Sequence, residues 1–169
     1  MRIQSRLAIV LLAGVAGLTL IGAAAPKPTG SEAVRTEVQQ FMKAYVNAEN
    51  GNDATALMEM VSRKPGVASI TMGEITRGWE AIRTEVDKSV ESEIQLQMTL
   101  GTIDVETLSP SMALAFAPCA VTLTMEHESM KLHGAITLVV EKSSGKWKVL
   151  HEHSSAQVAD IEDPETQGD

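Results

Sequence analysis

Apolar residues recur every three or four positions in the first half of the chain, a spacing that predicts amphipathic helices. Three helices are expected, over residues 31–51, 53–64 and 79–90. Apolar and aromatic side chains recur along one face of the first helix, at Val34, Val38, Phe41, Met42, Tyr45 and Val46. Between the second and third helices, two short extended pieces meet at Gly73 and predict a small hairpin.

The second half of the chain alternates apolar and polar residues, which predicts antiparallel strands joined by short turns. Four long strands are expected, at residues 93–108, 111–126, 130–141 and 146–155. The alternation changes phase at Gly101, which indicates a bulge, and Pro118 indicates a second bulge or an edge position. The predicted fold class is α+β, with three N-terminal helices and a short hairpin packed on a four-strand antiparallel meander.

The turns allow the strand registers to be predicted. A loop centred on Ser144–Gly145 pairs Leu138 with His151 and Ile136 with His153, and a turn at residues 127–128 sets the preceding hairpin. Both registers agree on one inward face, made of Cys119, Val121, Leu123, Met125, Met130, Leu132, Ile136, Leu138, Val140, Val149, His151 and His153. A slip of one residue in either hairpin would invert this assignment.

The two ends of the chain differ from this domain in composition. Two arginines, an uncharged run over residues 7–21 and small residues up to Ala25 are typical of a secretory signal peptide. The predicted organisation is a signal peptide at 1–25, a linker at 26–30, the α+β domain at 31–155 and an acidic disordered tail at 156–169. Export to the periplasm or the medium is expected, without membrane attachment after cleavage; an uncleaved N-terminal anchor is the alternative.

The net charge and the cysteine content exclude some partners and some chemistry. The formal net charge is -8, so the chain would be repelled by phosphate backbones and no nucleic-acid partner is expected. Cys119 is the only cysteine, which excludes an intramolecular disulfide. In its apolar surroundings it is expected to be a buried, inert thiol, with a nucleophile as the alternative.

The order of these elements resembles the SnoaL-like, nuclear-transport-factor-two-like superfamily. The resemblance is carried by the segments Ala48–Met60, Ile75–Val86 and Gly145–Ser155, and it spans most of the chain between Ser31 and Ser155. It implies a curved sheet and helices that enclose a hydrophobic cavity. The family contains isomerases, cyclases, hydrolases, dehydratases and proteins without chemistry, so the resemblance implies a pocket and not a reaction.

His151 and His153 are the predicted catalytic residues, since both imidazoles would face one ligand and one could act as general acid or base. Hydrogen bonding that only stabilises the fold is the alternative. A metal site would need a third ligand on the same face, so neither a metal nor another cofactor is expected. The arrangement of the ketosteroid isomerases, which needs a tyrosine and an acid as oxyanion donors, is not matched because the only tyrosine, Tyr45, lies on the first helix.

The predicted ligand-binding residues are the inward apolar side chains together with two residues of the third helix. By resemblance, Trp79 begins the helix that covers the cavity mouth. Arg83 either belongs to a solvated helix face or holds an anionic ligand. The full set is Trp79, Arg83, Met98, Cys119, Val121, Leu123, Leu138 and Val149.

Two functions follow from these residues. The first is an exported module that binds a small apolar or amphipathic molecule and forms a homodimer through the outward sheet face. The second is a small isomerase, dehydratase or hydrolase that uses a pocket histidine as general acid or base. The first is favoured, because the inward residues do not complete an acid, a base and an oxyanion donor. An acid entering the cavity from the helices, such as Asp53 or Glu74, would favour the second.

Overall fold

All three predicted helices form, and the strands join into one sheet. The computed structural model describes residues 30–126 and 128–159, so the predicted signal peptide, nearly all of the linker and most of the acidic tail lie outside the described residues. The helices are α1 (Gly30–Asn50), α2 (Ala54–Met60) and α3 (Trp79–Glu91). The strands are β1 (Ala68–Thr71), β2 (Glu74–Arg77), β3 (Gln95–Leu100), β4 (Asp104–Ser109), β5 (Met112–Met125), β6 (Glu128–Ser143) and β7 (Lys146–Val158).

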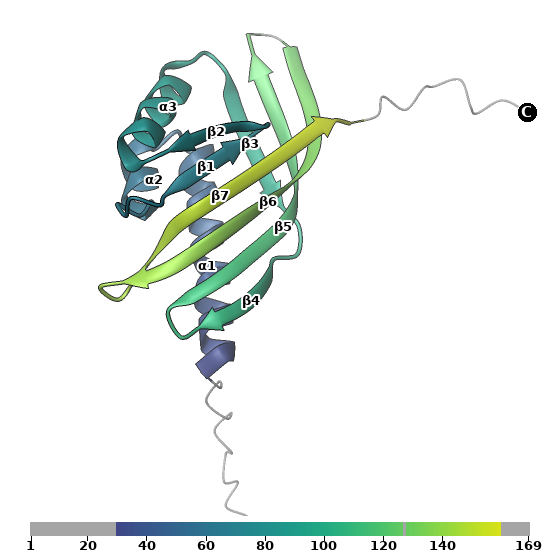
Figure 1. The fold of residues 1–169 in the computed structure, drawn as a ribbon. Helices are drawn as coiled ribbons and strands as arrows, with labels where there is room; N and C mark the ends of the chain where they lie inside the picture. Colours follow the sequence, from purple (N-terminus) through teal and green to yellow (C-terminus); the bar gives the residue numbers. More distant parts are fainter. Residues whose placement is uncertain (1–29, 127, 160–169) are drawn as a thin grey trace, which may run out of the picture.

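The hairpin of β1 and β2 belongs to the main sheet. The strand order is β2-β1-β7-β6-β5-β3, and β4 pairs with β5 beyond the end of β3 (Figure 1). β1 runs parallel to β7, whereas the other pairs are antiparallel. An α+β fold with a curved, mostly antiparallel sheet is thus confirmed. The prediction of a four-strand meander is wrong, because the β1–β2 hairpin extends the sheet and the first predicted long strand, residues 93–108, divides into β3 and β4.

α1 runs along one face of the sheet, and α2 and α3 lie beside the β1–β2 hairpin (Figure 1). Small side chains on β5 allow α1 to approach closely, since the inward positions Ala113, Ala115 and Ala117 are buried. Val38 and Met42 of α1 are fully buried in the same core as the inward side chains of β6, which are Ile136, Leu138 and Val140. Each such burial contributes about 1.5–3 kcal/mol before the entropy of ordering is counted. No helix in the described ranges is both long and apolar enough to cross a bilayer.

The interruption at Gly101 explains how a proline fits inside a long strand. β3 ends at Leu100 and β4 begins at Asp104, and the N–H of Gly101 donates to the carbonyl of Pro118 over 2.8 Å. In an antiparallel strand, the amide nitrogen and carbonyl of one residue face the same neighbour, so the missing N–H of Pro118 faces this interruption. Pro118 is therefore neither on an edge strand nor at a bulge of β5; the neighbouring strand breaks instead.

The register between β5 and β6 differs from the prediction by two residues. Cys119 pairs with Gly134 and Val121 with Leu132, because the turn lies one residue earlier than expected. A shift of two residues keeps every side chain on its predicted face. The apolar inward face of these two strands is accordingly confirmed, although Met125 and Met130 at the hairpin end are exposed.

The register predicted between β6 and β7 is correct only up to Val149. Val140 pairs with Val149 as predicted, but Val139 then pairs with His151, so Leu150 is an extra residue in a bulge. Beyond it, Leu138 faces Glu152 instead of His151. The inward orientation predicted for His151 and His153 is therefore wrong, since the bulge moves both imidazoles to the outer face and turns Glu152 inward. β7 then continues to Val158, three residues past the predicted end of the domain.

Candidate functional site

A cavity of about 470 Å³ lies between the three helices, the β1–β2 hairpin and the inward side chains of β3 and β7. We call it the inner cavity. Exposed lining residues surround its entrance: Asn52, Asp53, Thr71, Met72, Glu74, Glu85 and Ser89. Buried and half-buried residues form its walls and floor: Tyr45, Ala48, Glu49, Ala54, Leu57, Val61, Ser69, Thr76, Ile82, Val86, Val90, Leu96, Met98, Glu152 and Ser154.

Three polar residues, Tyr45, Glu49 and Glu152, form a cluster in the floor of the inner cavity. The hydroxyl of Tyr45 donates to Oε2 of Glu152 over 2.7 Å, and the Ser69 hydroxyl donates to the same oxygen over 3.5 Å. Glu49 as a residue is half-buried, but its Oε2 is shielded from solvent and has no hydrogen-bond partner in the described part of the chain. A buried polar atom without a partner costs free energy, and in a cavity it marks where a ligand can bind.

Burial controls the protonation of this cluster. Burial raises the pKa of Glu49 well above its ordinary value, and the nearby charge of Glu152 raises it further. The pKa of Glu152 is also raised by burial, against the hydrogen bonds from Tyr45 and Ser69 that lower it. The pKa of Tyr45 is raised by burial and by both carboxylates. Removing the charged forms from water is the common cause, so the two carboxyl groups hold protons above the usual pH range.

Helix periodicity brings Tyr45 and Glu49 to the same face of α1, because they are four residues apart. The next residue, Asn50, attaches this end of the helix to the sheet. Its side chain donates to the carbonyl of Met98 over 2.9 Å and accepts from the N–H of Met98 over 2.7 Å. The last turn of α1 is therefore held against β3 at a residue that itself lines the inner cavity.

The bulge in β7 supplies the third member of the cluster. Next to the bulge, Val61 forms a parallel bridge with Val149, and the N–H of Ser62 donates to the Val149 carbonyl over 2.8 Å. Bulges redirect side chains, and here the redirected side chain is that of Glu152. His151 is half-buried and His153 is exposed, and neither lines the inner cavity.

The outer face of the sheet therefore carries both histidines. His151 lies opposite Val139 and His153 opposite Thr137, in rows that continue to Leu114 and Phe116 of β5. Phe116 is 43% exposed, which is unusual for a large aromatic side chain. The homodimer expected through this face stays a prediction, as does the catalytic role of the two histidines.

The predicted ligand-binding residues separate into three groups. Met98 lines the inner cavity. Cys119, Val121, Leu138 and Val149 are buried in the core, and Leu123 is half-buried beside it. Trp79 and Arg83 line a second depression. The thiol of Cys119 is free and buried, and burial raises its pKa, as expected for an inert cysteine.

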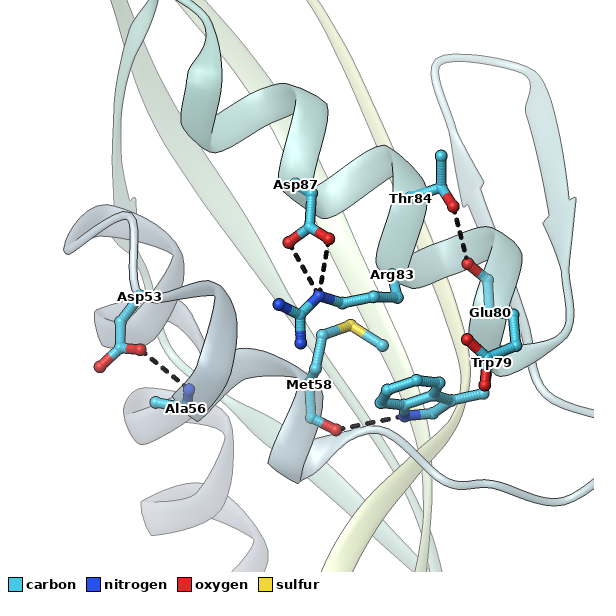
Figure 2. Close-up of polar contacts among 8 residues, drawn as sticks. All are labelled: Asp53, Ala56, Met58, Trp79, Glu80, Arg83, Thr84 and Asp87. Atoms are coloured by element: carbon cyan, nitrogen blue, oxygen red, sulfur yellow. Dashed lines mark hydrogen bonds and ion pairs between the residues drawn. The ribbon is translucent and has the colours of Figure 1, made fainter.

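This second depression, the outer groove, has a volume of about 740 Å³ and lies between α2, α3 and the β6–β7 hairpin. Trp79 donates from Nε1 to the carbonyl of Met58 over 3.3 Å, as Figure 2 shows. Arg83 forms an ion pair within its own helix, where its Nε lies 2.8 Å from both carboxylate oxygens of Asp87 (Figure 2).

The other cations of the outer groove are also engaged. Arg63 stacks over the ring of Trp79 at 3.6 Å, and the Nζ of Lys64 pairs with the buried carboxylate of Glu141. The Nζ of Lys148 donates to the carbonyl of Glu59. An anionic ligand would have to compete with these contacts, so the inner cavity is the stronger candidate site.

Tyr45 overturns one argument made from the sequence. Its position on the first helix predicts no match to a site in which a tyrosine and an acid act together, but its hydroxyl donates to Glu152 in the cavity floor. Asp53 and Glu74 also line the inner cavity, as the enzyme hypothesis required. Glu49 was overlooked, although it falls on the apolar face of α1, seven residues after Met42; an ionisable residue on such a face is a usable signal.

Comparisons with known proteins agree with this architecture. A family model described as "SnoaL-like domain" matches residues 38–159. A nuclear transport factor 2-like superfamily protein from Salmonella enterica serovar Typhimurium is similar at 16% identity, over 82% of this chain and 99% of that chain, with a TM-score of 0.69. A candidate scytalone dehydratase from Novosphingobium aromaticivorans is similar at 14% identity, over 76% and 87% of the two chains, with a TM-score of 0.68. At these identities the likeness concerns the fold alone, and no curated protein matches the sequence.

Proposed function

Because the chain belongs to the SnoaL-like domain family, we propose that it binds a small amphipathic molecule in the inner cavity. The observation that carries this proposal is the cavity of about 470 Å³, which combines apolar walls with one buried polar cluster. Its volume is within the range of small-molecule sites, which are mostly apolar with a few polar groups that orient the ligand. Export of the chain is part of the same proposal and rests on the signal-peptide pattern of residues 1–25.

The walls and floor of the inner cavity suggest how the ligand is oriented. Leu57, Val61 and Ile82 are buried on one side of the space, and Met98 is buried on β3. An apolar body packed against them would leave its polar end at the cluster of Tyr45, Glu49 and Glu152. Removing about 100 Å² of apolar ligand surface from water contributes about 2.5 kcal/mol, so this packing is the main source of affinity.

Filling the inner cavity is expected to abolish binding. Val86 is half-buried on α3 and lines the cavity, so Val86→Trp would occupy the space of the ligand. Titration with the neutral fluorescent probe N-phenyl-1-naphthylamine should show saturable binding to the unaltered protein and at least about tenfold weaker binding to Val86→Trp. Ala81→Trp is the matched control, because Ala81 is exposed on the same helix and does not line the cavity. Absence of saturable binding, or equal affinity in both tryptophan variants, would reject the proposed function.

The cluster also supports a second function, a proton-transfer enzyme of the isomerase or dehydratase type. The specific observation is that two buried carboxyl groups with raised pKa values share a cavity with a phenol. In such an enzyme, the Glu49 carboxylate would take a proton from a carbon next to a carbonyl. The hydroxyl group of protonated Glu152, which accepts from Tyr45 on its other oxygen, would stabilise the enolate oxygen, and Glu49 would return the proton to a second carbon.

This second function predicts enzyme-dependent deuterium exchange in a cyclic enone. In heavy water, the protein should accelerate exchange of the acidic protons of 2-cyclohexenone, and Glu49→Gln should remove at least about 90% of that acceleration because an amide cannot carry the proton. Glu59→Gln, an exposed carboxyl on α2 outside the inner cavity, serves as the control. Full exchange in Glu49→Gln together with loss in His151→Ala would contradict the carboxylate mechanism and support the histidine prediction instead.

A further inference from the structure

We propose that the inner cavity selects an organic cation, a protonated amine attached to a compact apolar body, over neutral and anionic molecules of the same shape. The inference rests on the proposed ligand-binding function and adds the chemical class of the ligand.

The charges that line the inner cavity have one sign. Five carboxyl groups line it, and none of its described lining residues is a lysine, arginine or histidine. Asp53 accepts the N–H of Ala56 as a helix cap, and Glu85 pairs with the exposed Lys88. The other three, Glu49, Glu74 and Glu152, form no ion pair within the described ranges.

The floor of the inner cavity offers hydrogen-bond acceptors and needs donors. Oε2 of Glu49 is shielded from solvent and unpartnered among the described residues, whereas Glu152 already accepts from Tyr45 and Ser69. An ammonium group has three donors and no acceptor, so it complements a pair of carboxylates better than a hydroxyl, which has one donor. A carboxylate ligand would place a negative charge in a poorly solvated site whose described lining residues include no base, which is strongly unfavourable.

The walls of the inner cavity distinguish an organic cation from a bare metal ion. No group of three histidine, cysteine, aspartate or glutamate residues within the described structure is arranged to hold a metal. The space beside the cluster is lined instead by Leu57, Val61, Ile82, Val86, Leu96 and Met98. These side chains offer no oxygen ligands and gain from contact with hydrocarbon.

The entrance is negative as well. Asp53, Glu74 and Glu85 are exposed there, and the whole chain carries a formal charge of -8. A negative rim on a negative protein raises the local concentration of cations and speeds their encounter. Negative charge at the entrance, carboxyl groups that can ionise in the floor, and apolar walls thus favour the same class of ligand.

Amine binding must be coupled to proton release from the cluster. The charge of Glu152 on β7 raises the pKa of Glu49, and the charge of Glu49 in turn raises the pKa values of Tyr45 and Cys119. Glu49 also shares the cavity with Asp53, Glu74 and Glu85. None of these groups is basic, so a bound ammonium would be the positive charge that lowers the pKa of Glu49 and Glu152. The carboxyls would then ionise as the amine binds.

Calorimetric titration with three probes of one skeleton tests the inference: 4-phenylbutylamine, 4-phenylbutan-1-ol and 4-phenylbutanoate. At about pH 8 the amine remains protonated, and we expect it to bind at least about tenfold more tightly than the alcohol, with the carboxylate weakest. Titration in phosphate and in Tris should give different enthalpies for the amine, which reveals proton release, and equal enthalpies for the alcohol.

Glu49→Gln should reduce the preference for the amine over the alcohol by about tenfold, because the amide keeps the shape of the side chain and removes its ability to carry a negative charge. Glu59→Gln, outside the inner cavity, should change neither affinity. Equal affinity for amine and alcohol, tighter binding of the carboxylate, or an unchanged preference for the amine in Glu49→Gln would overturn the inference. If any of these results accompanies saturable binding of the alcohol or of N-phenyl-1-naphthylamine, the proposed ligand-binding function stands and only the preference for organic cations is rejected. If no probe binds, the ligand-binding function and the preference for cations are both rejected.

Discussion

Substituting alanine for Gly134 is expected to destabilise the protein by about 3 kcal/mol or more, or to prevent folding. Gly134 lies on β6 opposite Ala156 of β7. A β-carbon at this position would lie 2.0 Å from the carbonyl oxygen of Ser155 and 2.9 Å from the α-carbon of Ala156. Both are backbone atoms of a paired strand and cannot rotate away, so β6 and β7 would have to separate. Because domains are stable by only about 5–15 kcal/mol, this is a large fraction of the total.

Urea unfolding measured by far-ultraviolet circular dichroism checks this expectation. Gly66→Ala is the control, since a β-carbon on Gly66 would meet no atom within 4 Å. Gly134→Ala should unfold at a much lower urea concentration, and amide exchange should be fastest at the end of β7. An unfolding free energy within about 0.5 kcal/mol of the parent protein would show that the two strands do not approach as closely as described here.

The second large effect concerns pH: Glu49→Gln is expected to stabilise the protein near pH 8 and to change its stability little near pH 4. The pKa of Glu49 is well above its ordinary value of 4.5 in the folded protein, because burial disfavours the charged form. The folded state therefore binds more protons than the unfolded chain once the pH exceeds 4.5. Stability that is present below this pH is lost as the pH rises toward the folded pKa. Glutamine does not ionise, so the stability of the variant does not decline with pH on account of this position.

Other carboxyl groups act in a different pH range and do not obscure the result. Hydrogen bonds from Lys142 and Trp147 lower the pKa of Glu37. The pKa of Glu141 is lowered by hydrogen bonds from Lys64 and Ser62, although burial opposes them. A carboxyl group whose pKa is lowered in the folded protein contributes stability at pH values above its ordinary pKa of 4.5. This stability is lost as the pH falls through the pKa of the folded state. The stability of the parent protein should therefore be highest in weakly acidic solution.

Urea unfolding from about pH 4 to pH 8 gives the required curves. The parent protein should lose stability toward pH 8, and Glu49→Gln should flatten that decline, with the part due to Glu152 remaining. The exposed Glu59→Gln serves as the control and should follow the parent curve. Parallel curves for the parent and Glu49→Gln would mean that the Glu49 carboxyl ionises as freely in the folded state as in the unfolded chain.

Much of the fold could be predicted from the sequence. The spacing of apolar residues predicted α1 and placed Tyr45 on its buried face, and α2 begins directly after Asp53, where the second helix was expected. Gly73 forms the hairpin turn with a positive φ of 88°, a conformation that glycine adopts without strain. These features depend on residues close together in the chain, for which local propensity and periodicity are informative.

Most of the candidate site could not be predicted in this way. Its members come from α1, α2, α3, the β1–β2 hairpin, β3 and β7, and the distance between Tyr45 and Glu152 depends on how α1 lies on the sheet. The prediction favoured the histidines because the expected register placed both imidazoles on the inward face, where they could reach one ligand. The structure brings together two carboxyls and a phenol instead, and only Met98 of the predicted ligand-binding residues lines the inner cavity.

In the last strand, β7, the sequence pattern determines which side chains face inward in the first part, and tertiary contacts determine it in the second. Up to Val149, alternation between apolar and polar residues determined which side chains face inward, because only one phase buries Trp147 and Val149. In the following segment, His151 to Ser155, both alternating sets of side chains are polar, so the sequence pattern does not indicate which set faces the core. There the phase was decided by tertiary contacts: Val61 and Ser62 pair with Val149, β1 pairs with the residues beyond it, and the bulge at Leu150 turns Glu152 toward Tyr45.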